Sequence, residues 1–190
     1  MTDSAVQVAE NAVRPAPGTW NFDPSHSHLE FTVRHMVVGK TRGRFGSFRG
    51  TVNAADDHAA SSVQVEIDAA SIDTRDPKRD EHLRSADFLD VERHPVLTFA
   101  STAVRGSGTE WTVTGDLTIH GVTRSVDVDV TLEGVVDKDP FGYARAAFSG
   151  EAEIDREDFG LTWNATLESG GVLVGKKVKI SFEVEAVLSV

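Results

Sequence analysis

The sequence contains no cysteine among its 190 residues. Disulfide bridges and thiolate-based catalytic or metal sites are therefore excluded, and the composition suits a reducing compartment. The chain also lacks any apolar run near the roughly 20 residues that a membrane-spanning helix needs, so no membrane insertion is expected. Its first 18 residues have neither the basic segment nor the apolar core of a secretory signal. We therefore expect a cytoplasmic protein, or an exported one whose signal has been removed.

Acidic residues, which are abundant overall, are missing from one stretch. The formal net charge is −11, which argues against a nucleic-acid partner because phosphate backbones repel an acidic surface. Residues 31–55 nevertheless contain no Asp or Glu. The cations of this stretch are Arg34, Lys40, Arg42, Arg44 and Arg49. Such a basic run is either the solvated face of a strand or the rim of a site for an anionic or carbonyl headgroup.

Alternation of apolar and polar residues dominates the chain after residue 18. The apolar members of the clearest runs are Leu29, Phe31, Val33, Val63, Val65, Ile67, Trp111, Val113, Leu117, Ile119, Val126, Val128, Val130, Leu132, Val178, Ile180, Phe182 and Val184. A period of two gives each strand one dry and one wet face, which is typical of antiparallel sheets. About eight such strands make a barrel, although a sandwich fits the alternation equally well.

Two local patterns interrupt the strands. In residues 76–84, Asp76 suits an N-cap and Pro77 suits the first helical position, which predicts a short helix. His120 and Gly121 stand between two alternating runs and predict a tight hairpin turn. Residues 1–18 are rich in alanine and have no periodicity, so we predict a disordered leader there and a single domain over residues 19–190.

Two histidines are the first candidates for chemistry. On a strand, His26 and His28 would point to the same side and could seat a metal ion with two further ligands. His82, His94 and nearby carboxylates are candidates for those ligands, which would suit a metal-assisted hydrolase. An isolated His-x-His pattern is weak, and hydrogen bonding at the entry of a strand is the structural alternative.

Other catalytic patterns are missing. Asp73, Arg79 and Asp80 lie beside the predicted helix, where a local ion-pair and capping network is favoured over a pair of catalytic carboxylates. The sequence holds no Gly-x-Ser-x-Gly elbow and no glycine-rich phosphate loop between a strand and a helix. We therefore expect a protein that is not an enzyme, with no catalytic residue, no metal ion and no cofactor other than a bound lipid.

Eight segments in a fixed order resemble the YceI-like family. They are WNFDPSHS (20–27), FTVRH (31–35), RFGSFRG (44–50), DT (73–74), RDEHLRSADF (79–88), PVLTF (95–99), GDLTIHGVT (115–123) and REDFG (156–160). Each motif is modest alone, but together they span nearly all of residues 19–190. The resemblance implies an all-β fold, an extended eight-stranded antiparallel lipocalin-like barrel with a short helix between strands and a long apolar tunnel.

The resemblance also implies a ligand, a long-chain apolar lipid of the polyisoprenoid or isoprenoid quinone type, bound or carried in the tunnel. It leaves a homodimer open beside a monomer. From the alternation we predict the residues that form the tunnel wall to be Phe31, Val33, His35, Phe45, Phe88, Phe99 and Trp163. Arg42 and Arg44 are predicted at the rim. The rival hypotheses are the hydrolase at His26 and His28, and a ligand-free, stress-related barrel with a filled interior.

Overall fold

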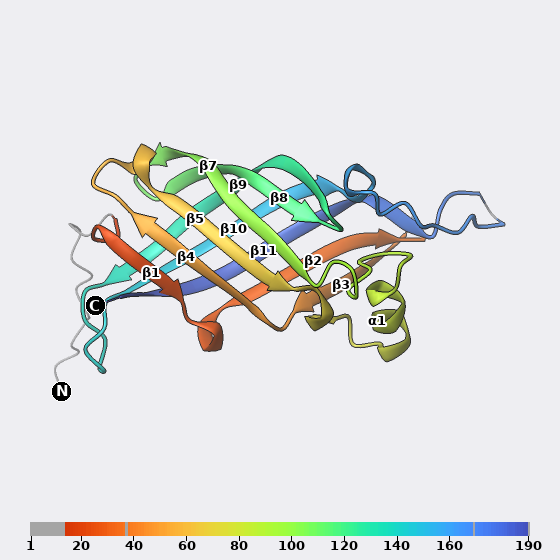
Figure 1. Ribbon diagram of the computed structural model, residues 1–190, viewed down its shortest axis with the longest axis horizontal. Coiled ribbons are helices and arrows are strands. Elements are labelled where there is room, and N and C mark those ends of the chain that lie inside the picture. Colours follow the sequence, from red (N-terminus) through yellow and green to blue (C-terminus); the bar gives the residue numbers. More distant parts are fainter. Residues whose placement is uncertain (1–13, 37, 169, 190) are drawn as a thin grey trace, which may run out of the picture.

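The protein is an elongated β-barrel, seen from the side in the computed structural model of Figure 1. The structure describes residues 14–36, 38–168 and 170–189. The predicted disordered leader falls largely on residues 1–13, which lie outside the described residues, and the first strand begins at Gly18. Strand β1 (Gly18–Phe22) and the last residues of β11 (Val174–Leu188) lie toward one end of the barrel, called below the chain ends, and helix α1 lies toward the other (Figure 1).

Eleven strands form one sheet within the described part of the chain. They are β1 (Gly18–Phe22), β2 (His28–His35), β3 (Gly39–Phe45), β4 (Phe48–Ala54), β5 (Ser62–Asp68), β6 (Ile72–Asp73), β7 (Val96–Ser107), β8 (Glu110–Ile119), β9 (Val122–Val136), β10 (Arg145–Asp155) and β11 (Val174–Leu188). Eight of them close into an antiparallel ring in the order β1-β4-β5-β7-β8-β9-β10-β11, because β1 pairs back onto β11. This closure confirms the predicted eight-stranded barrel and excludes the sandwich.

Three neighbouring strands of the wall are interrupted at similar levels. The 3₁₀ turn η1 (Pro24–His26) separates β1 from β2, two residues separate β3 from β4, and η3 (Ala69–Ser71) separates β5 from β6. Beyond these breaks β2, β3 and β6 continue the sheet from β11, and β6 pairs with β3 alone. The barrel therefore has a ring closed by hydrogen bonds toward the chain ends and a part with a free strand edge toward α1.

Helix α1 (Pro77–Arg84) covers that free edge, and it confirms the predicted short helix. Asp76 caps it by accepting hydrogen bonds from the backbone N–H groups of Lys78 and Arg79. Arg84 donates from the helix to the carbonyls of Ala70 (2.8 Å) and Ile72 (2.8 Å), so the unpaired edge is satisfied by a side chain.

The residues around Thr74 form a hydrogen-bonded network, in line with the structural interpretation of this segment. The buried Asp80 carboxylate accepts from the Thr74 N–H (2.8 Å) and Oγ1 (2.6 Å), and Arg79 donates to the same hydroxyl (2.7 Å). Asp73 instead pairs with Arg44 across the β3–β6 ladder, at 3.0 Å. These carboxylates therefore hold the start of α1 in place.

Two apolar clusters fill the two ends of the barrel. The larger one lies toward α1 and contains Ile72, Leu89, Ile119, Ile154 and Phe159 among its buried members. The smaller one surrounds Trp20, Ala146 and Ala186, next to the chain ends. The predicted hairpin is confirmed, because His120 and Gly121 connect β8 to β9 with positive φ values of 52° and 73°.

Candidate ligand cavity

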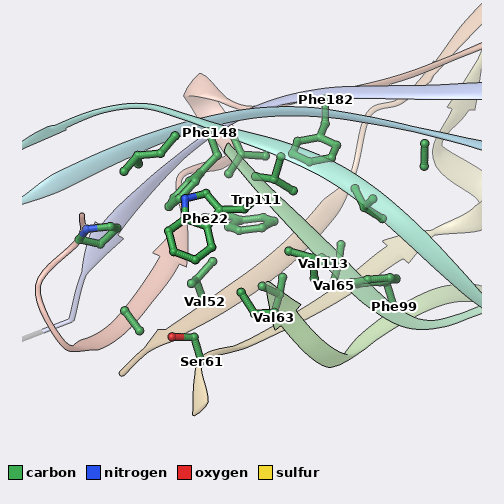
Figure 2. Close-up of a pocket in the computed structure, with 18 of the residues that line it drawn as sticks. Phe22, Val52, Ser61, Val63, Val65, Phe99, Trp111, Val113, Phe148 and Phe182 are labelled. Carbon is green, nitrogen blue, oxygen red and sulfur yellow. The ribbon is translucent and has the colours of Figure 1, made fainter. Parts of the chain in front are cut away.

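An internal cavity of about 230 Å³ lies inside the closed ring (Figure 2). It touches both clusters, since Ile67 and Leu117 of the larger one line it, as do Phe22 and Phe148, which pack against the smaller one. Almost every lining side chain is apolar. The lining residues labelled in Figure 2 are Phe22, Val52, Ser61, Val63, Val65, Phe99, Trp111, Val113, Phe148 and Phe182.

Period-two alternation builds this wall. Along β9 the inward members Val126, Val128, Val130 and Leu132 all line the cavity, whereas the intervening Asp127 and Asp129 are exposed. β5 and β11 repeat the pattern with the inward runs 63–67 and 180–184. The sequence shows the same alternating runs, so these residues could have been predicted to face the cavity. The sequence analysis used them to predict strands and did not include them among the predicted wall residues.

Three glycines let aromatic rings lie directly against the wall. A Cβ at Gly50 would lie 2.2 Å from the Phe22 ring, and one at Gly150 would lie 2.4 Å from the Phe182 ring. A Cβ at Gly115 would lie 2.4 Å from Cζ of Phe99. Because glycine in a strand allows this close approach, the aromatic side chains lie along the barrel wall and leave the centre of the barrel open.

Polar groups reach the cavity at one end, near the loop between β4 and β5. Arg14, His58 and Ser61 line it there, and the Arg14 guanidinium donates to the carbonyl of Asp56 (2.9 Å). The His58 ring packs edge-on against Trp111, with ring centroids 4.6 Å apart. These side chains are the candidate headgroup contacts. Sequence reasoning missed them, because Arg14 stands in the predicted leader and His58 in a loop without periodicity.

The structure separates the nine predicted site residues, all of which it describes. Phe99 alone lines the cavity. Phe31 and Phe45 pack against the larger cluster, with ring centroids 5.8 Å apart, and the Phe88 and Trp163 rings lie 5.3 Å apart near α1. Phe31 and Phe45 thus pack at the end of the barrel that the cluster fills, whereas Phe88 and Trp163 pack against His82 of α1, and none of the four lines the cavity.

The remaining predicted residues lie on β2 and β3, beyond the strand breaks. Val33 pairs with Val178 and Thr41, and His35 pairs with Gly39 and Val174 where β2 ends. Arg42 and Arg44 are exposed on β3. Neither arginine lines the cavity, whose polar lining side chains are those of Arg14, His58 and Ser61.

The histidines considered for a metal ion are not brought together. His26 Nδ1 donates to the Asp23 carboxylate, at 2.9 Å, while His28 is exposed and takes no part in that contact. Arg145 bonds Asp23 (2.8 Å), Asp139 and Glu185 together. Its guanidinium, more than the contacts from Ser25 and His26, holds the pKa of the Asp23 carboxyl well below its usual range. This network ties η1 to β10 and β11.

Comparison with known proteins assigns the chain to a family. The model of the YceI-like domain matches residues 20–186, which is most of the chain. The chain belongs to the YceI-like domain family. The UPF0312 protein ECA1782 of Pectobacterium atrosepticum is 38% identical over 162 residues, which cover 84% of either chain.

Two solved structures share the fold of this YceI-like chain. Burkholderia cenocepacia BcnA superposes with a TM-score of 0.73 and 28% identity, over 86% of this chain and 98% of that one. A polyisoprenoid binding domain from Saccharophagus degradans superposes with a TM-score of 0.70 over 90% of this chain and 98% of that one. At 16% sequence identity, this superposition shows a shared fold. Among the described residues of the YceI-like chain, no helix has the length and apolar character to cross a membrane.

Proposed function

We propose that this YceI-like protein binds or carries a long-chain apolar lipid, of the polyisoprenoid or isoprenoid quinone type, without turning it over. The observation that carries the proposal is the cavity whose walls are almost entirely aliphatic and aromatic side chains. Removing apolar surface from water contributes roughly 25 cal/mol per Å², so a hydrocarbon chain gains most where every wall is apolar. The related fold of a polyisoprenoid binding domain supports the same ligand class.

The cavity's size favours a slender ligand. Its volume of about 230 Å³ lies below the roughly 300–1,000 Å³ of typical small-molecule pockets, and the barrel around it is elongated. An unbranched or methyl-branched chain entering lengthwise fits such a space better than a compact ring system. We place its polar headgroup toward Arg14 and His58, where a cation and an imidazole can meet an anionic or carbonyl group.

Native mass spectrometry of freshly purified full-length chain tests the proposal. We expect an adduct of several hundred daltons that is lost after extraction with organic solvent. The Phe99→Arg chain should carry no adduct, because an unpaired charge in the cavity disfavours an apolar ligand. The matched control is Ala100→Arg, whose side chain is exposed on the same strand and faces Asp116 across the β7–β8 ladder. It should keep the adduct.

A second substitution covers the case in which the buried charge prevents folding. Val128→Trp keeps the wall apolar and fills the cavity from β9, so it should lower the adduct occupancy while far-UV circular dichroism stays that of a β-barrel. A bare parent mass in repeated preparations would argue for the ligand-free structural barrel instead. Equal adduct in the parent, Phe99→Arg and Val128→Trp chains would show that the lipid lies elsewhere.

A further inference from the structure

Two histidines and a carboxylate meet at the α1 end of the barrel, away from the cavity. The donor atoms of Asp90, His94 and His120 all lie within 4.8 Å of one another. Asp90 and His94 belong to the turn that precedes β7, and His120 forms the tip of the β8–β9 hairpin. None of the three lines the cavity, so this cluster is independent of the proposed lipid site.

Both segments that carry these side chains are anchored in the core. Leu89 and Ile119 precede Asp90 and His120 directly, and both are buried members of the larger apolar cluster. The turn is closed by its own backbone, because the Asp90 carbonyl accepts from the N–H groups of Arg93 (3.0 Å) and His94 (2.8 Å). The three donors are therefore held by rigid neighbours, as a preorganised binding site requires.

Glycines without side chains leave room for the imidazole rings of His94 and His120. The two imidazole centroids lie 4.8 Å apart. A Cβ at Gly121 would lie 2.7 Å from Cε1 of His94, and one at Gly160 would lie 3.6 Å from Nδ1 of His120. Any larger side chain at position 121 would collide with the His94 ring, so the glycine allows the two rings to share one side of the hairpin.

The negative charge of the Asp90 carboxylate is only weakly neutralised by its ion-pair partner. Its side chain is 12% exposed, and its ion pair is with Arg93 at 3.6 Å, whose own side chain is 78% exposed. A long, solvated arginine at this distance can swing away when a more strongly bound cation arrives. The Asp23–His26–Glu185 cluster differs, because Arg145 is 23% exposed and already bonds both of its carboxylates.

We infer that Asp90, His94 and His120 form a binding site for a divalent transition-metal ion, with Zn²⁺ as its representative. Two imidazoles and one carboxylate are the donors that this class of metal prefers, and water would complete the coordination. Ligand atoms about 2.0–2.2 Å from a tetrahedral Zn²⁺ lie roughly 3.3–3.6 Å apart, so small side-chain rotations close the set from its present spread. The ion would clamp the turn before β7 to the β8–β9 hairpin.

Titration of metal-free, untagged full-length protein with ZnCl₂ in a calorimeter near neutral pH tests the site. We expect one ion per chain and a higher melting temperature in its presence, because an ion that binds only the folded state stabilises it. His94→Phe keeps a ring over Gly121 and removes the donor nitrogens. His120→Asn retains a residue that tolerates the positive φ of the turn. Each should weaken binding by more than about 100-fold, the upper end of what a supporting partner of a ligand contributes.

Two control substitutions separate this site from other histidines. His28→Ala removes an exposed histidine outside both clusters, and His26→Ala disables the rival cluster at Asp23 and Glu185. Both should bind Zn²⁺ like the parent. Visible absorption of the Co²⁺-loaded parent should show imidazole-ligated d–d bands that are lost in His94→Phe. No binding by the parent, unchanged binding by both His94→Phe and His120→Asn, or loss confined to His26→Ala would overturn the inference.

Discussion

Arg156 is a buried cation whose removal should release a whole segment of the protein. It is 3% exposed, and its guanidinium donates to the backbone carbonyls of Leu161, Trp163, Val174 and Gly175. Burial lowers the pKa of this guanidinium more than the neighbouring acids raise it. The charge is thus held at a desolvation cost, and the four carbonyls offset it.

The expected loss of stability comes from the carbonyl acceptors that Arg156→Met would leave without a hydrogen-bond donor. The carbonyls of Leu161 and Trp163 lie outside the strands, and an unsatisfied buried acceptor costs about 1–3 kcal/mol. Relief of the guanidinium's desolvation offsets part of this, since burying an ion costs several kcal/mol. We expect a net loss of about 3 kcal/mol, which for a domain of this size lowers the melting temperature by about 6–12 °C.

Scanning calorimetry and hydrogen exchange together check this prediction. Residues 161–175 should exchange faster in the Arg156→Met chain than in the parent, while β8 and β9 keep their protection. The control is Lys176→Met, which removes an exposed lysine paired with Glu157 and should leave the melting temperature almost unchanged. A fall of less than about 2 °C for Arg156→Met, equivalent to under about 1 kcal/mol, would refute the reasoning.

Two further predictions concern the Arg145 network and the cavity wall. Because Arg145 depresses the pKa of Asp23, the stabilisation from this pair is fully present above about pH 4–5 and is lost as pH falls toward the lowered pKa. Thermal melts of the Arg145→Met chain should therefore lose less stability between about pH 6 and pH 3 than the parent does, and an equal acid loss would contradict the assignment. Gly115→Val should push the Phe99 ring into the cavity and lower the free energy of unfolding by about 1–3 kcal/mol, because its Cβ would lie 2.7 Å from the Ala100 carbonyl. Denaturant melts measure the loss of stability and adduct occupancy measures the loss of cavity space. Unchanged values of both would contradict the close packing.

Local patterns predicted the elements well because their physical causes are local. The alternation over 126–132 identifies β9 and its inward face, and Asp76 followed by Pro77 identifies the start of α1. The choice between barrel and sandwich is different in kind. It depends on the pairing of Trp20 with Leu188, two residues from opposite ends of the chain, which no alternation encodes. The barrel was predicted from the family resemblance alone.

The site was harder to predict because alternation gives a side chain's direction and not its level along the barrel. Phe31 and Phe99 both face inward and both pack against the larger cluster, yet Phe31, which lies on β2 beyond the break after β1, does not line the cavity. Phe99 lies within the closed ring and lines the cavity. The meeting of His94 with His120 has the same origin, because 25 residues, including strands β7 and β8, lie between them in the sequence.

The three strand breaks divide the barrel into two regions, which we expect to open independently. β11 is the strand that belongs to both, since it pairs with β1 over residues 186–188 and with β2 over residues 174–183. Local opening of β6 disturbs one short ladder with β3, whereas opening of β11 breaks ladders at both ends. Cooperative unfolding units follow such ladders. If the cavity binds a lipid as proposed, we expect it to enter by loosening of one region while β11 and the opposite region keep the fold.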